Sequence, residues 1–130
     1  MNVDDIRTIT VGSGTPVHPE WPPGQAGPTW SETEWRCFGS EAGNRWFGGA
    51  WEGEPGTLDL PAYPYDELCV MLAGRVALTD EQGSRRVFEA GEAFFVPRGF
   101  RGRWETLEPS KKIFVALGPF SQAERDRTVS

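Results

Sequence analysis

The chain has 130 residues and a net charge of −6, and it contains 16 glycines and 11 prolines. So many helix-interrupting residues disfavour a helix bundle, and the excess of acids disfavours a nucleic-acid binder that works through phosphate contacts. No apolar run approaches the roughly 20 residues of a membrane span, and the first residues lack the basic and apolar parts of a secretory signal. Two cysteines, Cys37 and Cys69, are too few for a disulfide scaffold and are expected to be reduced. We therefore expect one cytoplasmic domain that contacts neither nucleic acid nor membrane.

Residues 1–34 form a predicted N-terminal arm that is rich in proline and has no alternating apolar pattern. Because proline lacks a backbone donor and has a fixed φ, this stretch is predicted to contain neither a central strand nor a helix. Trp21 and Trp30 are poorly suited to a solvated tail, so the arm is expected to pack against something. Two interpretations remain open. The arm covers its own domain or a neighbouring subunit, or it forms a lid over a site.

Residues 35–120 show the short strands and regular turns of an all-β sandwich or barrel. The predicted strands lie at 36–38, 45–47, 57–60, 67–78 with a break at Gly74, 85–88, 93–96, 100–106 and 111–117. The strand at 93–96 is expected to be buried, and 80–84 is expected to be a hairpin loop in which Gly83 adopts a positive φ. Residues 121–130 form a C-terminal tail, where one or two helical turns are predicted at 121–127.

Two spacings in this region carry a resemblance to a known family. Glu67 is followed by six residues and then Gly74, and Gly91 is followed by five residues and then Pro97-Arg98-Gly99. These spacings resemble the two sequence motifs of cupins, which are small double-stranded β-helix, or jelly-roll, barrels. Three further segments are similar to the cupin subfamily that includes the C-terminal cupin of (S)-ureidoglycine aminohydrolase: Gly49-Ala50-Trp51-Glu52, Pro55-Gly56 and Gly102-Arg103-Trp104-Glu105.

The resemblance implies a metal site made of three histidines and one glutamate, and this chain departs from it. The positions that correspond to the histidines hold Pro61, Tyr63 and Gly102. Only Glu67 remains, and the one histidine of the chain, His18, lies in the arm. One carboxylate is a poor site for a transition metal, so we expect no cofactor. A divalent metal at Glu67 stays open, with the help of neighbouring donors: Tyr65, Asp66 and Cys69.

Glu67 is the most informative candidate residue. If it points into the barrel, its carboxylate is costly to bury alone, so we expect a raised pKa or a partner such as Lys112 or Arg103. A buried glutamate of this kind suits general acid or base catalysis. The alternative is that an ion pair merely replaces the lost metal. Tyr63, at a histidine position, either acts on a ligand as a hydrogen-bond donor or acid, or only fills the vacated space.

Aromatic side chains are the other candidates for a ligand site. Trp51 and Trp104 are either core residues or an apolar wall against a flat ligand, and Tyr65 and Arg103 are further candidate ligand-binding residues. Cys69 is expected to be a small buried side chain rather than a nucleophile. Three other large apolar side chains are predicted to lie in the core: Trp46, Met71 and Phe95.

Basic residues gather late in the chain, with seven bases and four acids between 85 and 112. This local excess either steers an anionic ligand toward one rim or belongs to subunit salt bridges and a solvated face.

The leading hypothesis is a small-molecule-binding cupin with metal-independent acid–base chemistry, namely isomerisation, elimination or hydrolysis. Its expected catalytic residues are Tyr63, Glu67 and Lys112. A non-catalytic metabolite sensor and a metal-dependent hydrolase resembling the ureidoglycine enzyme are the alternatives. We also expect a homodimer, because an open barrel leaves strand edges that a partner covers.

Overall fold

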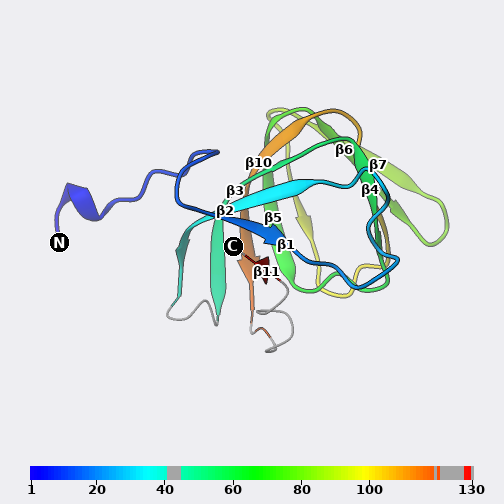
Figure 1. The fold of residues 1–130 in the computed structure, drawn as a ribbon, viewed down its shortest axis with the longest axis horizontal. Coiled ribbons are helices and arrows are strands. Elements are labelled where there is room, and N and C mark those ends of the chain that lie inside the picture. The colour runs from blue at the N-terminus through cyan, green and yellow to red at the C-terminus, as the bar shows by residue number, and fades with distance from the viewer. Residues whose placement is uncertain (41–44, 119, 121–127, 130) are drawn as a thin grey trace.

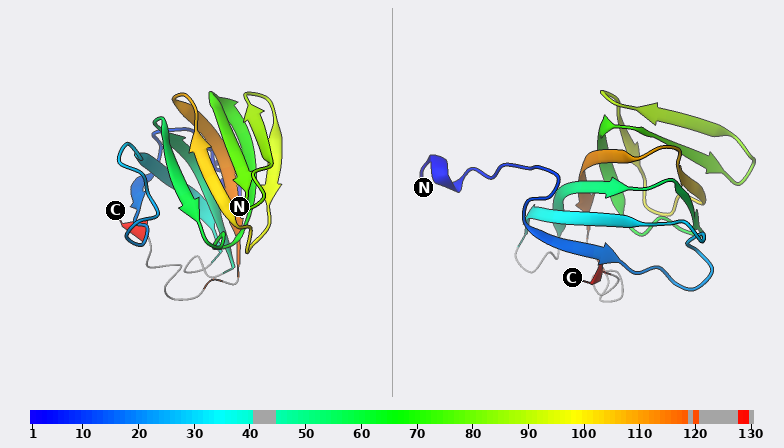
Figure 2. Two further views of the ribbon diagram at one scale, coloured as in Figure 1. Left: turned by 90° about the vertical axis from the view of Figure 1, so that its right-hand side faces the viewer. Right: turned by 45° about the horizontal axis from the view of Figure 1, so that its top comes forward.

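The computed structural model describes residues 1–40, 45–118, 120 and 128–129. Two antiparallel sheets face each other, one with strand order β11-β1-β2-β3-β10-β5-β8 and the other with order β4-β9-β6-β7 (Figures 1 and 2). The predicted all-β jelly-roll fold is therefore confirmed. The elements are η1 (Val3–Asp5), β1 (Thr15–Pro19), β2 (Glu32–Gly39), β3 (Trp46–Gly53), β4 (Gly56–Leu60), β5 (Asp66–Ala73), β6 (Arg75–Asp80), β7 (Arg85–Glu89), β8 (Ala93–Val96), β9 (Gly102–Thr106), β10 (Ser110–Leu117) and β11 (Thr128–Val129).

The core lies between the two sheets because side chains alternate between the faces of each strand. On β5, Glu67, Cys69 and Met71 are buried, whereas Leu68 and Leu72 are exposed. β10 shows the same alternation, and its register with β3 places Lys112 beside Trp51. This register fixes which side chains meet in the interior.

Two predicted glycine positions have the expected backbone. Gly74 has φ +81° and separates β5 from β6, and a Cβ at this position would overlap Ser110 and the backbone of Pro109. Gly83 has φ +85° in the loop between β6 and β7. A residue with a side chain would be strained at either position, and at Gly74 it would also lack space. The break at Gly74 and the hairpin loop at 80–84 are therefore confirmed.

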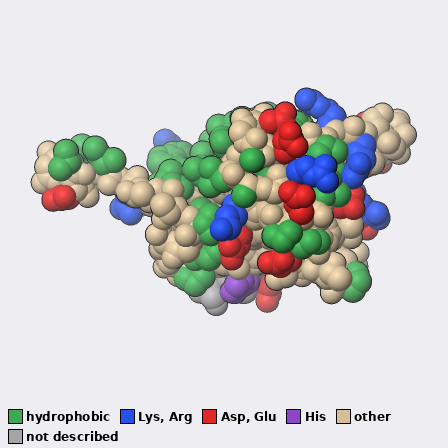
Figure 3. Space-filling view, turned by 90° about the horizontal axis from the view of Figure 1, so that it is seen from above, with side chains coloured by type: hydrophobic (Ala, Val, Ile, Leu, Met, Phe, Trp, Pro, Cys, Tyr) green, Lys and Arg blue, Asp and Glu red, His purple; other side chains and the backbone are tan. Residues whose placement is uncertain are grey.

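The N-terminal region, where neither a central strand nor a helix was predicted, contains one strand near the edge of the larger sheet. Val3–Asp5 forms a single 3-10 turn, and β1 pairs with β2 and with the short β11. Pro16 and Pro19, which lack a backbone donor, are tolerated in a strand near the edge of a sheet. Residues before β1 extend away from the body of the molecule (Figures 1 and 3), and the first six side chains are exposed.

The prediction that β8 is buried is wrong. β8 is the last strand of its sheet, and only Val96 on it is buried, while Phe95 is 52% exposed. Trp46 is 39% exposed, so it is not a core residue either, whereas Met71 is buried as expected. Both misplaced aromatic residues occupy outward positions in the strand alternation, which their apolar character does not reveal.

Residues 121–127, where helical turns were expected, lie outside the described part of the chain. Within the described part, no helix is long and apolar enough to cross a membrane.

Candidate functional site

The candidate site is a buried cluster of Tyr63, Glu67 and Lys112 in the interior of the barrel. Glu67 lies on β5 and Lys112 on the neighbouring strand β10, and the Lys112 Nζ is 3.3 Å from Glu67 Oε2. The Tyr63 hydroxyl donates a hydrogen bond to the other carboxylate oxygen, Oε1. The three predicted catalytic residues therefore meet, and both oxygens of Glu67 have a partner.

Tyr63 precedes β5 and is held by backbone contacts to the Pro97–Gly99 turn. Its N–H donates to the Phe100 carbonyl at 2.8 Å, and its carbonyl accepts from the Gly99 N–H at 2.9 Å. These bonds fix the backbone at Tyr63, whose side chain is buried and reaches Glu67. Burial and the neighbouring Glu67 raise the pKa of the Tyr63 phenol well above its usual value, so the phenol is a donor.

Lys112 is a buried ammonium with four neighbours. Burial acts to lower its pKa, but the Cys69 sulfur, 3.5 Å away, and the Glu67 carboxylate raise it above its usual value. Burial also raises the pKa of Cys69, which stays a neutral thiol, so Glu67 supplies the charge that keeps Lys112 protonated. The Lys112 Nζ lies 4.9 Å from the Trp51 ring centroid and 4.3 Å from that of Trp104. Two cation–π contacts thus stabilise the ammonium on its remaining sides.

The aromatic candidates form the wall around this ammonium. Trp51 and Trp104 are each 3% exposed and meet edge to face, with ring centroids 5.9 Å apart. Tyr65 contacts the Tyr63 ring edge to face, and burial raises its pKa well above the usual value. Trp51 and Trp104 are therefore core residues, and their contact with a flat ligand stays a prediction.

Arg103 does not join the site and needs correction as a candidate. It alternates with Trp104 on β9, so the inward position of Trp104 turns Arg103 outward. The Arg103 Nε bonds to Asp59 Oδ1 at 2.8 Å, and both side chains are more than half exposed. Of the two predicted partners of Glu67, the structure selects Lys112.

Glu32, which sequence reasoning missed, ties the arm to the barrel interior. Its Oε2 accepts hydrogen bonds from the indole N–H groups of Trp21 at 2.7 Å and Trp30 at 2.6 Å. Its Oε1 accepts from the indole N–H of Trp51 at 2.9 Å. Burial raises the pKa of Glu32, and the three donors act in the opposite direction. The expectation that the arm tryptophans pack against something is met by this shared carboxylate.

Glu34 is a second interior acid on β2 that the sequence did not reveal. It is 6% exposed and lies 3.4 Å from the Arg36 Nε. Burial raises the pKa of Glu34 to about 7, against the effect of Arg36. Glu32 and Glu34 are two residues apart on an inward strand face, and that spacing next to tryptophans was the available signal. Assigning these positions to a proline-rich arm concealed it.

The cluster encloses little space. The cavity among these residues has a volume of about 30 Å³, room for about one water molecule. Its lining comprises Trp21, Trp30, Glu32, Glu34, Trp51, Leu58, Leu60, Tyr63, Tyr65, Glu67, Trp104 and Lys112. Apart from Arg103, the residues expected to line a ligand cavity do lie together, but they fill the centre of the barrel.

These residues do not fit the metal that the cupin resemblance implies. The ammonium of Lys112 lies beside Glu67 and repels a second cation. Tyr63 and Cys69 are both held in their protonated forms, which are poor ligands. At Gly102, which corresponds to a ligand histidine, a Cβ would overlap the Thr79 carbonyl oxygen. In the described ranges, no three His, Cys, Asp or Glu side chains are placed to hold a metal ion.

Two facing antiparallel sheets around a closed polar centre define this protein as a cupin. Residues 40–114 match the EutQ-like cupin domain, and the chain belongs to that family. The family has a fold that binds small molecules. No curated protein is significantly similar to the chain.

Solved structures of similar fold agree with this assignment. The Clostridium difficile EutQ protein is 22% identical, with a TM-score of 0.62 over 71% of each chain. A putative ethanolamine utilization protein Q from Salmonella typhimurium is 20% identical, with a TM-score of 0.60 over 70% of this chain and 72% of that one. A protein of unknown function from Pseudomonas syringae is 23% identical, with a TM-score of 0.70 over 82% of this chain and 45% of that one. At these identities the likeness is one of fold.

Proposed function

We propose that this cupin binds a small polar metabolite without a resident metal, and that Tyr63, Glu67 and Lys112 form its reactive centre. The observation that carries the proposal is the buried carboxylate of Glu67, held between a phenol and an ammonium. A carboxylate with two proton-bearing partners can take a proton from a ligand and return one to it. This arrangement suits isomerisation, elimination or hydrolysis.

Each residue of the centre has a separate role in this proposal. Glu67 exchanges the proton with the ligand. The Lys112 ammonium stabilises negative charge that develops on a carbonyl or carboxylate oxygen, in a site from which water is largely excluded. The Tyr63 phenol, whose pKa is raised by burial, stays protonated and donates a hydrogen bond that holds the carboxylate in place.

Access to this centre requires the arm to move. A cavity of about 30 Å³ is too small for a metabolite, and Trp21 and Trp30 form part of its wall. Their bonds to Glu32 hold residues 21–30 against the barrel. We therefore favour the interpretation of this segment as a lid, which a ligand displaces on entry.

The proposal is tested by screening small carboxylates, amides and ureides for a thermal shift of the wild-type protein and then for turnover. For a compound that is turned over, Glu67→Gln should lower kcat by about 100-fold or more, because it removes the proton-exchanging group and keeps the shape. Full turnover by the Glu67→Gln variant would refute the role of Glu67. Arg103→Gln, which changes an exposed arginine outside the cluster, is the matched control.

A non-catalytic binding or sensor protein is the second candidate. It is favoured by the internal pairing of the cluster, in which Glu67 and Lys112 satisfy each other without a ligand. A compound that binds to the wild-type protein without turnover would support this candidate over the catalytic one.

A metal-dependent hydrolase related to ureidoglycine aminohydrolase is the third candidate. It needs a cation at Glu67, where Lys112 already supplies the positive charge. Metal analysis of protein purified without chelator separates this candidate from the metal-independent proposal. A stoichiometric content of Mn, Fe, Ni or Zn would favour the hydrolase.

We further propose a cytoplasmic homodimer. Cys37 and Cys69 are both free thiols, which suits a reducing compartment. The outer face of the larger sheet carries five apolar side chains that are at least 39% exposed: Trp46, Leu68, Leu72, Phe95 and Leu117. A second copy placed on this face would cover them and the unpaired edge of β8. Sedimentation of the wild-type protein as a monomer at micromolar concentration would refute the dimer.

A further inference from the structure

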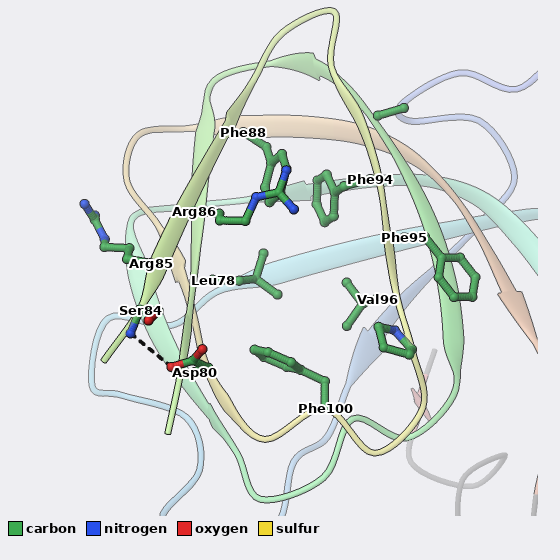
Figure 4. A pocket seen from close by; sticks show the side chains of 12 residues that line it. Leu78, Asp80, Ser84, Arg85, Arg86, Phe88, Phe94, Phe95, Val96 and Phe100 are labelled. Atoms are coloured by element: carbon green, nitrogen blue, oxygen red, sulfur yellow. Dashed lines mark hydrogen bonds between the residues drawn. The ribbon is translucent and has the colours of Figure 1, made fainter. Parts of the chain in front are cut away.

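A larger pocket lies away from the polar centre, between the edge strands of the two sheets. β7 ends the four-stranded sheet and β8 ends the seven-stranded sheet. The pocket between them has a volume of about 500 Å³ (Figure 4). This volume lies within the range of small-molecule sites.

The interior of this pocket is aromatic and apolar. Phe88 on β7 and Phe94 on β8 stack with ring centroids 4.1 Å apart and an interplanar angle of 17°. Leu78, Val96 and Phe100 point into the same hollow (Figure 4). A flat ring or a branched alkyl group would exchange water for these side chains.

Arg86 supplies a positive charge to the pocket. It is two residues from Phe88, so both side chains lie on the inward face of β7, and its Cζ is 5.0 Å from the Phe88 ring centroid. Among the described residues, Arg86 has no carboxylate partner. The neighbouring Arg85 also lines the pocket, but its side chain points away from the hollow (Figure 4) and pairs with Glu105 at 3.5 Å.

One acid, Asp80, also lines the pocket. Its Oδ1 accepts hydrogen bonds from the N–H groups of Gln82 at 2.9 Å and Ser84 at 3.0 Å, so it caps the hairpin loop. A single guanidinium next to this fixed negative charge suits a monoanion better than a phosphate dianion. A planar carboxylate matches the guanidinium group in two parallel hydrogen bonds.

We propose that this pocket binds a small amphipathic monocarboxylate, whose aromatic or branched aliphatic body packs among Phe88, Phe94 and Phe100 and whose carboxylate bonds to Arg86. The site is distinct from the proposed reactive centre. Val96 and Phe94 are the strand partners of Glu67 and Cys69, so they form the wall between the two regions. Neither Glu67 nor Lys112 lines the pocket. The inference therefore goes beyond the proposed function and does not depend on it.

Binding of phenylacetate and of its neutral analogue phenylacetamide to the full chain tests this proposal, with isothermal titration and amide NMR as readouts. Phenylacetate is expected to saturate and to shift resonances of β7 and β8. Arg86→Gln should weaken phenylacetate binding about tenfold or more, because it removes a charge-assisted pair. Arg75→Gln, the matched control on an exposed arginine outside the pocket, should change affinity less than about twofold. Phenylacetamide should bind wild-type protein about as weakly as phenylacetate binds the Arg86→Gln variant.

Several results would overturn the proposal. One is the absence of saturable binding by both phenylacetate and 4-methylpentanoate. Equal losses in the Arg75→Gln and Arg86→Gln variants would mean non-specific attraction. NMR shifts confined to Trp51 and Trp104 would place the ligand at the polar centre. If Arg86→Gln changes the sedimentation of the protein and leaves phenylacetate affinity unchanged, the pocket holds a second copy of the chain.

Discussion

The barrel centre and the pocket between β7 and β8 divide two properties that a binding site usually combines. The centre gathers Glu32, Glu34, Glu67 and Lys112 around a cavity of only about 30 Å³. The edge pocket has about 500 Å³ of space, but its lining is mainly apolar and its one inward cation is Arg86. The centre therefore has acid–base groups and almost no room, while the pocket has room and few groups that react. Variants that affect the barrel centre and spare the edge pocket, or the reverse, test whether the two regions are separate.

The largest expected effect comes from breaking the ion pair of the centre. Lys112→Met leaves the Glu67 carboxylate buried without its counter-charge, which should cost about 3–5 kcal/mol in the free energy of unfolding. Urea denaturation measures this loss. Phenylacetate binding in the edge pocket should persist wherever the variant is folded.

Lys111→Met is the matched control, because the neighbouring Lys111 is exposed and should change stability by less than about 0.5 kcal/mol. The double variant Glu67→Gln/Lys112→Met, which removes both charges, should regain at least roughly half of the loss. A Lys112→Met variant within about 1 kcal/mol of wild type would contradict the counter-charge role.

The next effect is a pH dependence that originates at Glu34. Burial raises the pKa of its carboxyl in the folded state from 4.5 to about 7. The folded protein thus binds this proton more tightly, and the stabilisation is complete below pH 4.5 and is lost as the pH rises toward 7. Over this range the loss amounts to about 3 kcal/mol.

Glu34→Gln should remove that loss, so the variant gains stability relative to wild type as the pH rises from 4.5 to 7. Urea denaturation at several pH values measures the difference. Parallel stability curves for the two proteins would contradict the assignment to Glu34.

A smaller effect is expected at the lid. Trp30→Phe keeps an aromatic ring but removes the N–H that bonds to Glu32 at 2.6 Å, which should cost about 1.5–3 kcal/mol. It should also speed the solvent exchange of the Trp51 indole N–H, which NMR resolves and which bonds to the same Glu32. Trp46→Phe, on the outer face of β3, is the control and should change neither quantity. Unchanged exchange of the Trp51 indole N–H in the Trp30→Phe variant would argue against this segment as a lid.

The smallest effect is expected at Arg103. Its pair with Asp59 is more than half exposed on both sides, so Arg103→Gln should cost less than about 0.5 kcal/mol. Turnover and ligand affinity should be unchanged. A large loss of turnover or of ligand affinity in this variant would mean that Arg103 contributes to the site.

Much of the centre could be predicted because strand alternation and motif spacing act locally. The spacing from Glu67 to Gly74 placed a carboxylate on an inward strand face, and the same register brings Lys112 to it. Tyr63 was predicted as a site residue because it occupies the position of a histidine in the cupin motif. Arg103 was misassigned because a motif does not reveal on which face of its strand each member lies.

Other features depend on contacts between distant segments, which a single sequence does not encode in a readable pattern. Glu32 accepts hydrogen bonds from the indole N–H groups of Trp21, Trp30 and Trp51. Its own segment was predicted to belong to a proline-rich arm. β8 has the composition of a buried strand, but its place at the sheet edge is set by the order of strands. The edge pocket arises from the same strand order. Within the described part of the chain, β7 and β8 are the last strands of the two sheets, and the pocket lies between them.

The most direct test of the account is the protonation state of Lys112, followed by NMR of protein labelled with ¹⁵N-lysine. The account predicts an ammonium signal from Lys112, absent in Lys112→Met, that persists above pH 10.5, the usual pKa of a lysine side chain. A Lys112 side chain that is neutral near pH 8 would mean that Glu67 does not hold a buried cation, and it would contradict the claim that a lysine stands in for the metal of this barrel.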